Sequence, residues 1–317
     1  MIMKHSLLLG SLICFTSFAA STPALATDEV EQYERKVVVE KGTATWCQWC
    51  PRSIVGFRTM YEKYPNNFIG IAMHDDDMYS PSYIYMLWRI DGGLPKATMN
   101  RKHEIDPNET ALENYYQSEI NNARARILMT ATWEDEQKTE AVIQTTTRFA
   151  QDTEGEFRIA YVVTENSVGP FLQRNAYSGG TTVMGGFESE AGYVQMLHDH
   201  VARSISNVDG ELSSVPENPV GRTDYEYTYT LSLPDNIQNK ENIELIVLLI
   251  NQVTGAIENA DVKKYSEVYE MGTTAIGNVP TATPLSSCYY DIHGRAYDSK
   301  PTAKGVYIYK GQKIVVQ

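Results

Sequence analysis

Two cysteines separated by two residues, Cys47 and Cys50, are the side chains whose types and spacing best suit chemistry. A thiol at the N-terminus of a helix is stabilised as a thiolate, because unpaired backbone N–H groups and the helix dipole favour negative charge there. A second thiol one turn further along can attack the mixed disulfide that the first has formed and release the bound partner. The spacing therefore predicts thiol–disulfide exchange, with Cys47 as the nucleophile and Cys50 as the resolving thiol.

The residues around the pair are suited to contact a protein substrate. Trp46 would shield one side of the cysteines from water, and Trp49 between them could rest on the partner protein. About forty-five residues downstream, Leu94 and Pro95 precede a predicted strand. A proline at such a place is most often part of a plain turn, but a cis-proline beside the cysteines can hold the extended backbone of a substrate. We therefore predict substrate contacts at Trp46, Trp49, Leu94 and Pro95.

A lone pair of cysteines also has two plainer interpretations. It can be half of a zinc site, although no second pair follows and the nearest histidines, His74 and His103, fall at a predicted strand end and in a loop. It can also be a structural disulfide of an exported protein. The acidic run at residues 75–77 could hold a cation, but such a run is usually a solvated loop. We expect no metal and no cofactor, and the structural disulfide stays as an alternative.

The elements that would position the cysteines follow a regular order. A β-branched run at residues 37–40 predicts a buried strand before the pair, and the helical spacing of Ile54, Phe57 and Met60 predicts a helix after it. Further elements are predicted as a strand at 68–73, a helix at 83–90, a turn at 92–95, a strand at 96–101 and a helix at 107–126 with Asp106 as N-cap. This order is that of the thioredoxin fold. We predict an α/β thioredoxin-like domain over residues 27–126.

One position departs from that fold's usual pattern. Thioredoxins and disulfide isomerases usually keep a buried acid six residues before the first cysteine, where it accepts the proton of the second. Here that position is Lys41, and Glu40 lies one step earlier. Neighbours on a strand point to opposite faces, so Glu40 need not face the cysteines. We treat Glu40 as the possible proton acceptor and expect slow or altered proton transfer at Cys50.

After Arg126 the hydrophobic period changes from helical to two, which is typical of half-buried antiparallel strands. Strands separated by turn residues, as in a β-sandwich, are predicted at residues 127–133, 140–149, 157–163, 225–233 and 244–250. A helix is predicted near 191–205. We therefore expect an all-β sandwich-like domain over residues 127–271, a linker over 272–287 and a short C-terminal β module over 288–317.

The first 26 residues have the features of a signal peptide. Lys4 precedes an apolar run at residues 7–20, and Ala24-Leu25-Ala26 offers the small-x-small pattern for cleavage after Ala26. The run is too short to cross the roughly 30 Å of a bilayer's hydrocarbon core. Cys14 could indicate lipoprotein processing, but the residues before it lack the usual leucine and small residue. We expect an exported protein.

The net charge and the number of cysteines limit the partners and the disulfides that the protein can have. The net charge of −13 makes the surface repel nucleic acid, so we expect no nucleic-acid partner. Once the signal peptide is removed, Cys47, Cys50 and Cys288 remain, which is one close pair and one leftover rather than a disulfide framework. Cys288 is expected to pack as a small apolar residue or to be a free thiol.

The chain resembles the twenty-eight-kilodalton outer membrane protein family of Bacteroidetes over roughly residues 30–265. The residues that carry the resemblance are Val38-Val39-Glu40, Thr45-Trp46-Cys47-Gln48-Trp49-Cys50-Pro51, Ile71-Ala72-Met73-His74, Leu94-Pro95, Asn100-Arg101, Asn175-Ala176-Tyr177, His200-Val201-Ala202-Arg203, Leu248-Leu249-Ile250-Asn251 and Ile257-Glu258-Asn259-Ala260. The resemblance implies a thioredoxin-like domain joined to a β-rich domain. The tail, from Tyr290 to Ile308, is similar to the C-terminal sorting modules of type nine secretion, which implies outer-membrane passage and surface display.

Two functions of different classes follow. The first is an envelope thiol–disulfide oxidoreductase that acts on exported protein substrates and is served by a redox partner protein. The alternative is an outer-membrane or surface binding or adhesion protein that uses the thioredoxin-like fold as a scaffold, with the cysteines locked as a disulfide. A structural component of the outer-membrane surface is a third possibility. Localisation at the outer membrane or cell surface is favoured, with the periplasm as the alternative.

Overall fold

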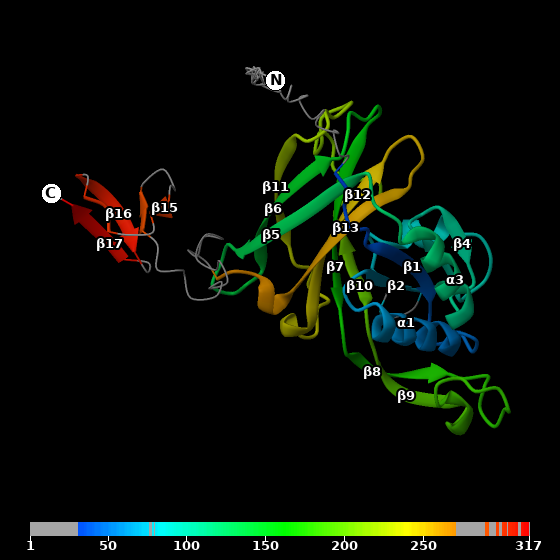
Figure 1. Ribbon diagram of the computed structural model, residues 1–317. Coiled ribbons are helices and arrows are strands. Elements are labelled where there is room, and N and C mark those ends of the chain that lie inside the picture. The colour runs from blue at the N-terminus through cyan, green and yellow to red at the C-terminus, as the bar shows by residue number, and fades with distance from the viewer. Residues whose placement is uncertain are drawn as a thin grey trace, which may run out of the picture. The chain divides into compact units, whose positions relative to one another are not determined.

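The computed structural model describes residues 31–270 apart from 76, 77 and 79, and the segments 289–291, 296–297, 300–302, 304–309 and 312–316 (Figure 1). The predicted signal peptide, the predicted linker and Cys288 lie outside the described residues. Within the described part of the chain, no helix is both long enough and apolar enough to span a bilayer.

An eight-stranded mixed sheet forms the centre of the described fold, in the order β13-β12-β7-β10-β2-β1-β3-β4 (Figure 1). Its strands are β1 Val37–Thr43, β2 Phe68–His74, β3 Lys96–Met99, β4 His103–Ile105, β7 Phe157–Glu165, β10 Val201–Ile205, β12 Ile243–Asn251 and β13 Ile257–Lys264. β1 pairs parallel with β2 and antiparallel with β3. On its other side β2 meets β10, where Val201 pairs with Ala72. Strands from both predicted domains therefore share one sheet, and residue 126 does not separate two sheets.

Three helices cover the part of the sheet that carries the cysteines: α1 Pro51–Lys63, α2 Ile84–Trp88 and α3 Glu109–Glu119. Phe57 of α1 and Leu112 of α3 pack with Val37 and Val39 of β1 in one apolar cluster. α2 packs in another cluster with Val38, so it covers the opposite face of the sheet. The two faces of β1 therefore meet different helices, as the alternation of side chains along a strand requires.

A second, three-stranded antiparallel sheet, in the order β11-β6-β5, covers the far half of the main sheet (Figure 1). Its strands are β5 Ala125–Trp133, β6 Glu140–Phe149 and β11 Asp224–Ser232. Inward residues such as Ile127 and Ile143 pack with Tyr161 of β7 and Val247 of β12. The residues after 126 are thus β-rich, with two packed layers around one apolar core.

Two predicted helices differ from the structure. The helix predicted over 107–126 is shorter, because Asn108, not Asp106, accepts the backbone N–H of Ala111 as N-cap, and the chain enters β5 at Ala125. The helix predicted near 191–205 is wrong, since this segment forms β9 Tyr193–His198 and β10. β9 pairs with β8 Val168–Arg174, and this exposed two-stranded hairpin alternates in burial with period two.

The remaining elements are short. Three single-turn helices are η1 Phe187–Ser189, η2 Lys240–Asn242 and η3 Tyr265–Glu267. The C-terminal segments form a four-stranded antiparallel sheet of β14 Tyr289–Asp291, β15 Ala296–Tyr297, β16 Gly305–Tyr309 and β17 Gln312–Val316. A small antiparallel β module was expected in this region from the sequence.

Candidate functional site

Cys47 and Cys50 form a disulfide at the start of α1, with their Cα atoms 5.4 Å apart. Cys50 is the N-cap residue of the helix, and Pro51 follows at the first helical position. Cys50 is fully buried, while Cys47 is 4% exposed, so Cys47 is the one that retains contact with solvent. The pair packs in a small cluster with Ala44 and Leu94.

The Leu94–Pro95 peptide bond is cis, and it immediately precedes β3. The fold brings Leu94 against the disulfide although the two are more than forty residues apart in sequence. Trp46 and Trp49 are 55% and 47% exposed, which is unusual for tryptophan. The Trp46 ring donates a hydrogen bond to the Asp75 carbonyl oxygen at 2.8 Å. The four residues predicted to contact substrate thus lie on the cysteine loop and on the segment that packs against it.

Glu40 lies in a buried ion pair. Both of its carboxylate oxygens accept hydrogen bonds from Arg101, at 2.8 and 2.7 Å, and one also accepts the Tyr83 hydroxyl at 2.8 Å. Burial and the neighbouring Glu40 charge raise the pKa of Tyr83 well above its ordinary value. The Glu40 carboxylate is thus engaged by Arg101 and Tyr83, and its role in proton transfer at Cys50 stays a prediction.

Lys41 occupies the position on β1 that faces α1. Its Nζ donates a hydrogen bond to the Ser53 carbonyl oxygen at 3.2 Å and lies 4.0 Å from the centroid of the Phe57 ring. Burial lowers the pKa of Lys41 to about 7, although the charge of Asp199 opposes this effect. Ser53 in turn donates from its backbone N–H and its hydroxyl to the Cys50 carbonyl oxygen. The side of the helix that carries Cys50 therefore faces a buried amine instead of an acid.

The β8–β9 hairpin and the segment after β8 cover the cysteine loop, which the sequence did not predict. The backbone N–H of Arg174 donates to the Thr45 carbonyl oxygen at 2.8 Å, and that of Ala176 donates to Gln48 at 2.9 Å. The buried amide of Gln173 donates to the Cys47 carbonyl oxygen at 2.9 Å. Tyr177 also packs edge-on against Trp49, with ring centroids 5.7 Å apart. The distinctive stretch Asn175-Ala176-Tyr177 was the feature of the sequence that could have indicated this cover.

A Gln173→Leu substitution is expected to loosen this cover. It removes the side-chain donor to the Cys47 carbonyl oxygen, which then keeps the Cys50 backbone N–H at 3.2 Å, and the loss of one such hydrogen bond costs about 0.5–1.5 kcal/mol. We expect several-fold faster reduction of the Cys47–Cys50 disulfide by dithiothreitol in the folded protein, followed by alkylation and mass spectrometry. Gln195→Leu, on an exposed position of the same hairpin, is the matched control. Equal reduction rates in Gln173→Leu and the wild type would show that the hairpin does not limit access.

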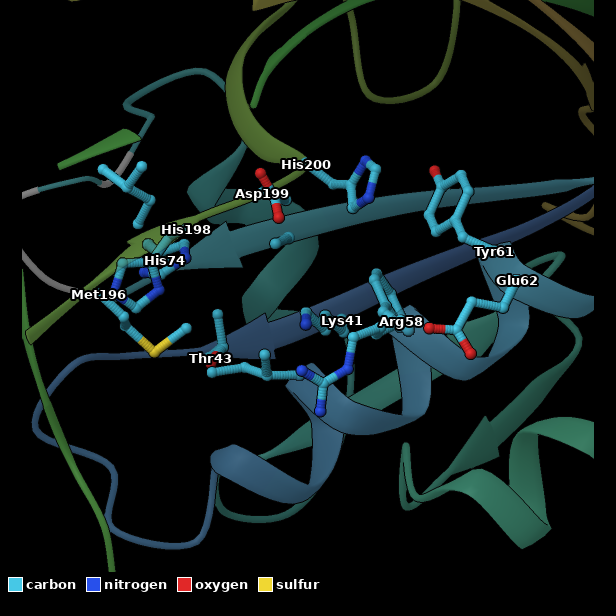
Figure 2. A pocket seen from close by; sticks show the side chains of 14 residues that line it. Lys41, Thr43, Arg58, Tyr61, Glu62, His74, Met196, His198, Asp199 and His200 are labelled. Carbon is cyan, nitrogen blue, oxygen red and sulfur yellow. The ribbon is translucent and has the colours of Figure 1, made fainter. Parts of the chain in front are cut away.

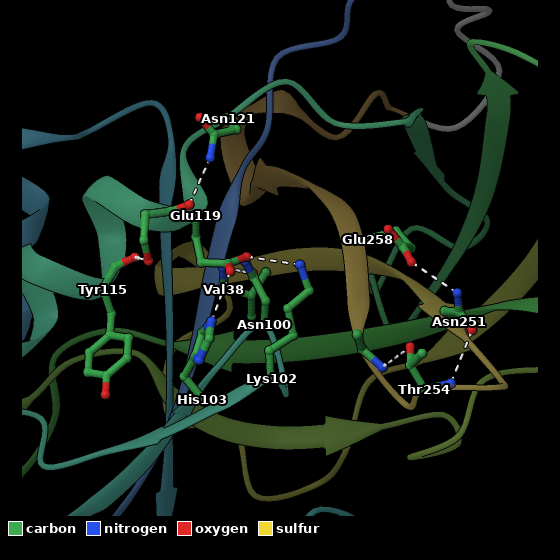
Figure 3. A network of polar contacts seen from close by, with 12 residues as sticks. Val38, Asn100, Lys102, His103, Tyr115, Glu119, Asn121, Asn251, Thr254 and Glu258 are labelled. Atoms are coloured by element: carbon green, nitrogen blue, oxygen red, sulfur yellow. Dashed lines mark hydrogen bonds and ion pairs between the residues drawn. The ribbon is translucent and has the colours of Figure 1, made fainter.

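Two groups of polar residues lie around the turn after β3 and around the turn between β12 and β13 (Figure 3). In the first, Asn100 accepts the Val38 backbone N–H and donates to Glu119. Burial opposes ionisation of Glu119, but hydrogen bonds from Asn100, Lys102 and His103 outweigh it and lower its pKa to about 2. In the second, Glu258 accepts from Asn251 and pairs with Arg124.

These polar groups fix the backbone of the turn after β3. Asn100 and Arg101 both have left-handed backbone angles, with φ of 50° and 56°. The Asn100 carbonyl oxygen accepts the Ile257 backbone N–H at 2.9 Å, which ties the turn after β3 to β13. Several residues that carry the family resemblance therefore have structural roles. Among the described residues, no group of three or more His, Cys, Asp or Glu side chains is placed to hold a metal ion.

The fold and site define a β-rich protein with a disulfide at the start of a helix. The chain belongs to the family described as Outer membrane protein Omp28, which matches residues 83–267, more than half of its length. The resemblance predicted from sequence is therefore confirmed, and the protein is an exported protein of the outer membrane or cell surface. The matched range includes Leu94 and Pro95 and begins after the cysteines.

The chain also matches solved structures, and the first one named here shares its fold. HBP35 of Porphyromonas gingivalis is 16% identical, with a TM-score of 0.57, over 90% of this chain and 99% of that chain. A protein from Agrobacterium tumefaciens is 16% identical, with a TM-score of 0.41, over 75% of this chain and 98% of its own. A domain of the outer membrane lipoprotein Omp28 from Porphyromonas gingivalis is 15% identical, with a TM-score of 0.27, over 47% and 98%. No curated protein sequence matches the chain.

Proposed function

We propose that this outer-membrane or cell-surface protein is a thiol–disulfide oxidoreductase with a thioredoxin-like domain at its N-terminal side. The observation that carries the proposal is the disulfide at the N-terminus of α1, packed against the cis Leu94–Pro95 segment. The surrounding elements are compatible with such a domain. β1 and β2 are parallel and joined by α1, β3 and β4 are antiparallel to their neighbours, and helices cover both faces of this part of the sheet.

The order of the exchange steps follows from the solvent contact that Cys47 retains and Cys50 lacks. In the reduced protein, the Cys47 thiolate attacks a substrate disulfide, so a Cys47–substrate bond forms and one substrate thiolate leaves and takes up a proton. The Cys50 thiolate then attacks the Cys47 sulfur, which restores the Cys47–Cys50 disulfide and releases the second substrate thiol. Two electrons have passed from the pair to the substrate, and a dithiol partner protein returns them. With an oxidising partner the same steps run in reverse.

The helix N-terminus and the exposed aromatic residues supply the rest of the site. Backbone N–H groups at the start of α1 favour the thiolate of Cys47 over the thiol. Trp46 and Trp49 offer apolar rings beside the pair, and rings of this kind contribute large contact areas to protein interfaces. The substrates are therefore expected to be exported proteins with accessible disulfides or thiols.

An insulin-reduction assay on the chain from residue 27 onward tests the proposal. With dithiothreitol as electron donor, the wild-type protein is expected to accelerate insulin precipitation, and Cys47→Ser is expected to abolish this acceleration. Reduced Cys50→Ser, freed of dithiothreitol and then mixed with insulin, is expected to accumulate a mixed disulfide at Cys47, visible as a mass increase that later addition of dithiothreitol removes. Cys47→Ser that is as active as the wild type would refute the proposal.

A surface binding protein with a locked disulfide is the second candidate. It is favoured by the near-complete burial of both cysteines and by the hydrogen bonds that the β8–β9 hairpin and the segment after it make to the cysteine loop. In that case the pair resists dithiothreitol until the protein unfolds, and the rate of reduction follows the rate of unfolding. A pair that is reduced while the protein stays folded speaks against this candidate.

A further inference from the structure

A cavity of about 520 Å³ lies between α1 and the turn that joins β9 to β10 (Figure 2). Its volume falls in the range of about 300–1,000 Å³ that is usual for small-molecule sites. Its apolar wall includes Ile54 and Phe57 of α1 and Leu197 of β9. Neither cysteine lines it, so its occupant would be independent of the disulfide.

Lys41 is a buried basic residue that lines this cavity. The residue is 4% exposed and reaches the cavity from β1, at its floor. An ammonium group has three N–H donors, and among the described residues Nζ has one acceptor, the Ser53 carbonyl oxygen at 3.2 Å. A buried amine with spare donors is stabilised when an anion supplies both charge and acceptors.

His200 forms a rigid aromatic wall opposite Lys41 (Figure 2). Its backbone is left-handed, with φ of 60°, which is uncommon for a residue other than glycine. The carbonyl oxygen of His200 accepts the Ala72 backbone N–H at 2.7 Å, and its backbone N–H donates to Asn166 at 2.9 Å, so this conformation is held from both sides. The imidazole stacks on the Tyr61 ring with centroids 4.1 Å apart.

The ionisable groups that face Lys41 come from every element around the cavity: Arg58, Glu62, His74, His198, Asp199 and His200. Four are basic types and two are acids. The guanidinium of Arg58 donates to the Gly185 carbonyl oxygen at 3.0 Å, and His200 lies 3.7 Å from Glu244. With neutral histidines, the formal charges of the lining are two cations, Lys41 and Arg58, and two carboxylates, Glu62 and Asp199. A preference for an anion therefore depends on the spare donors of the buried Lys41 ammonium and not on an excess of positive charge.

We propose that this cavity binds a small carboxylate that carries an aromatic ring, with the carboxylate paired to Lys41 and the ring against Phe57 and the Tyr61–His200 pair. One buried ammonium suits one carboxylate, whereas a phosphate group is usually held by several convergent donors. The aromatic walls favour a flat apolar body, since rings gain from offset and edge contacts with other rings.

Matched acids and amides test this proposal on the chain from residue 27 onward. The probes are benzoate, 4-hydroxyphenylacetate and indole-3-acetate, each compared with its primary amide by isothermal titration calorimetry between pH 6 and pH 9. At least one acid is expected to bind at least about tenfold more tightly than its amide, since the amide lacks the charge that pairs with Lys41. Above pH 7 the affinity of that acid is expected to fall by up to about tenfold per pH unit, as Lys41 loses its proton.

Lys41→Met is expected to abolish the preference for the acid while the protein stays folded, because methionine fills the same apolar space. Lys264→Met, at an exposed position, is the control and is expected to leave the preference unchanged. The proposal is overturned if no acid binds, if acids and amides bind equally to the wild type, or if Lys41→Met retains the preference. If the variant fails to fold, the comparison of acid with amide on the wild type still tests whether the cavity binds a carboxylate. None of these results depends on insulin reduction, so the oxidoreductase proposal is tested separately.

Discussion

Replacing Arg101 by methionine is expected to destabilise the protein by about 3–5 kcal/mol, the usual effect of removing one partner of a buried ion pair. The Arg101 side chain is 6% exposed, and that of Glu40 is fully buried. Arg101 binds both carboxylate oxygens and also donates to the Val208 carbonyl oxygen at 2.6 Å. Without it, the Tyr83 hydroxyl is the side-chain donor that Glu40 keeps among the described residues, and the carboxylate remains as an uncompensated charge between β1 and α2.

Chemical denaturation at pH 7 measures this loss. Arg89→Met is the matched control, because Arg89 pairs with Asp209 with both side chains about half exposed, and such pairs contribute about 0–1 kcal/mol. The double variant Glu40→Gln/Arg101→Met is expected to recover part of the stability, since it removes the unpaired charge as well. A loss below about 1 kcal/mol for Arg101→Met would contradict the buried-pair argument.

Replacing Lys41 by methionine has the opposite expected effect, a stabilisation of about 2–4 kcal/mol at pH 7. The pKa of Lys41 is about 7 in the folded protein against an ordinary value of 10.5. Between these values the unfolded chain binds a proton that the folded chain does not, so raising the pH stabilises the wild type relative to its unfolded state. The destabilisation by Lys41 is therefore fully present below pH 7 and fades as the pH approaches 10.5.

Urea denaturation of the wild type and of Lys41→Met at pH 6, 7, 8 and 9 measures the difference. Groups other than Lys41 titrate in both proteins, so their contributions cancel. The advantage of the variant is expected to shrink by up to about 1.4 kcal/mol per pH unit above pH 7. A difference that stays constant with pH would mean that Lys41 has an ordinary pKa in the folded protein.

The local elements near the cysteines could be predicted from sequence because short-range signals define them. The β-branched run before the pair, Pro51 after it and the helical spacing from Ile54 to Met60 correspond to β1 and α1. Leu94-Pro95 could be placed beside the cysteines from the order of elements alone. The opposite orientations of Glu40 and Lys41 also follow from the alternation of side chains along a strand.

The long-range arrangement could not be predicted in the same way. The nearly continuous burial of β2 and β7 indicates that both faces of each strand are covered. It does not indicate that β10 lies between these two strands in the sheet. The partner of Glu40 is sixty-one residues away, and only the turn with two left-handed residues brings Arg101 to it. The helix predicted near 191–205 is wrong because this segment contains a sharp turn between β9 and β10. That turn depends on the left-handed backbone of His200, which sequence periodicity does not reveal.

The pairing of β2 with β10 has a practical consequence for dissecting the protein. A fragment that ends at residue 126 would contain both cysteines and the Leu94–Pro95 segment, yet it would lack Gln173 and would leave β2 with an unpaired edge. Exposed edges of this kind recruit other chains and promote aggregation. We therefore expect the half of the molecule that carries the cysteines to need β10 from the later half to protect this edge.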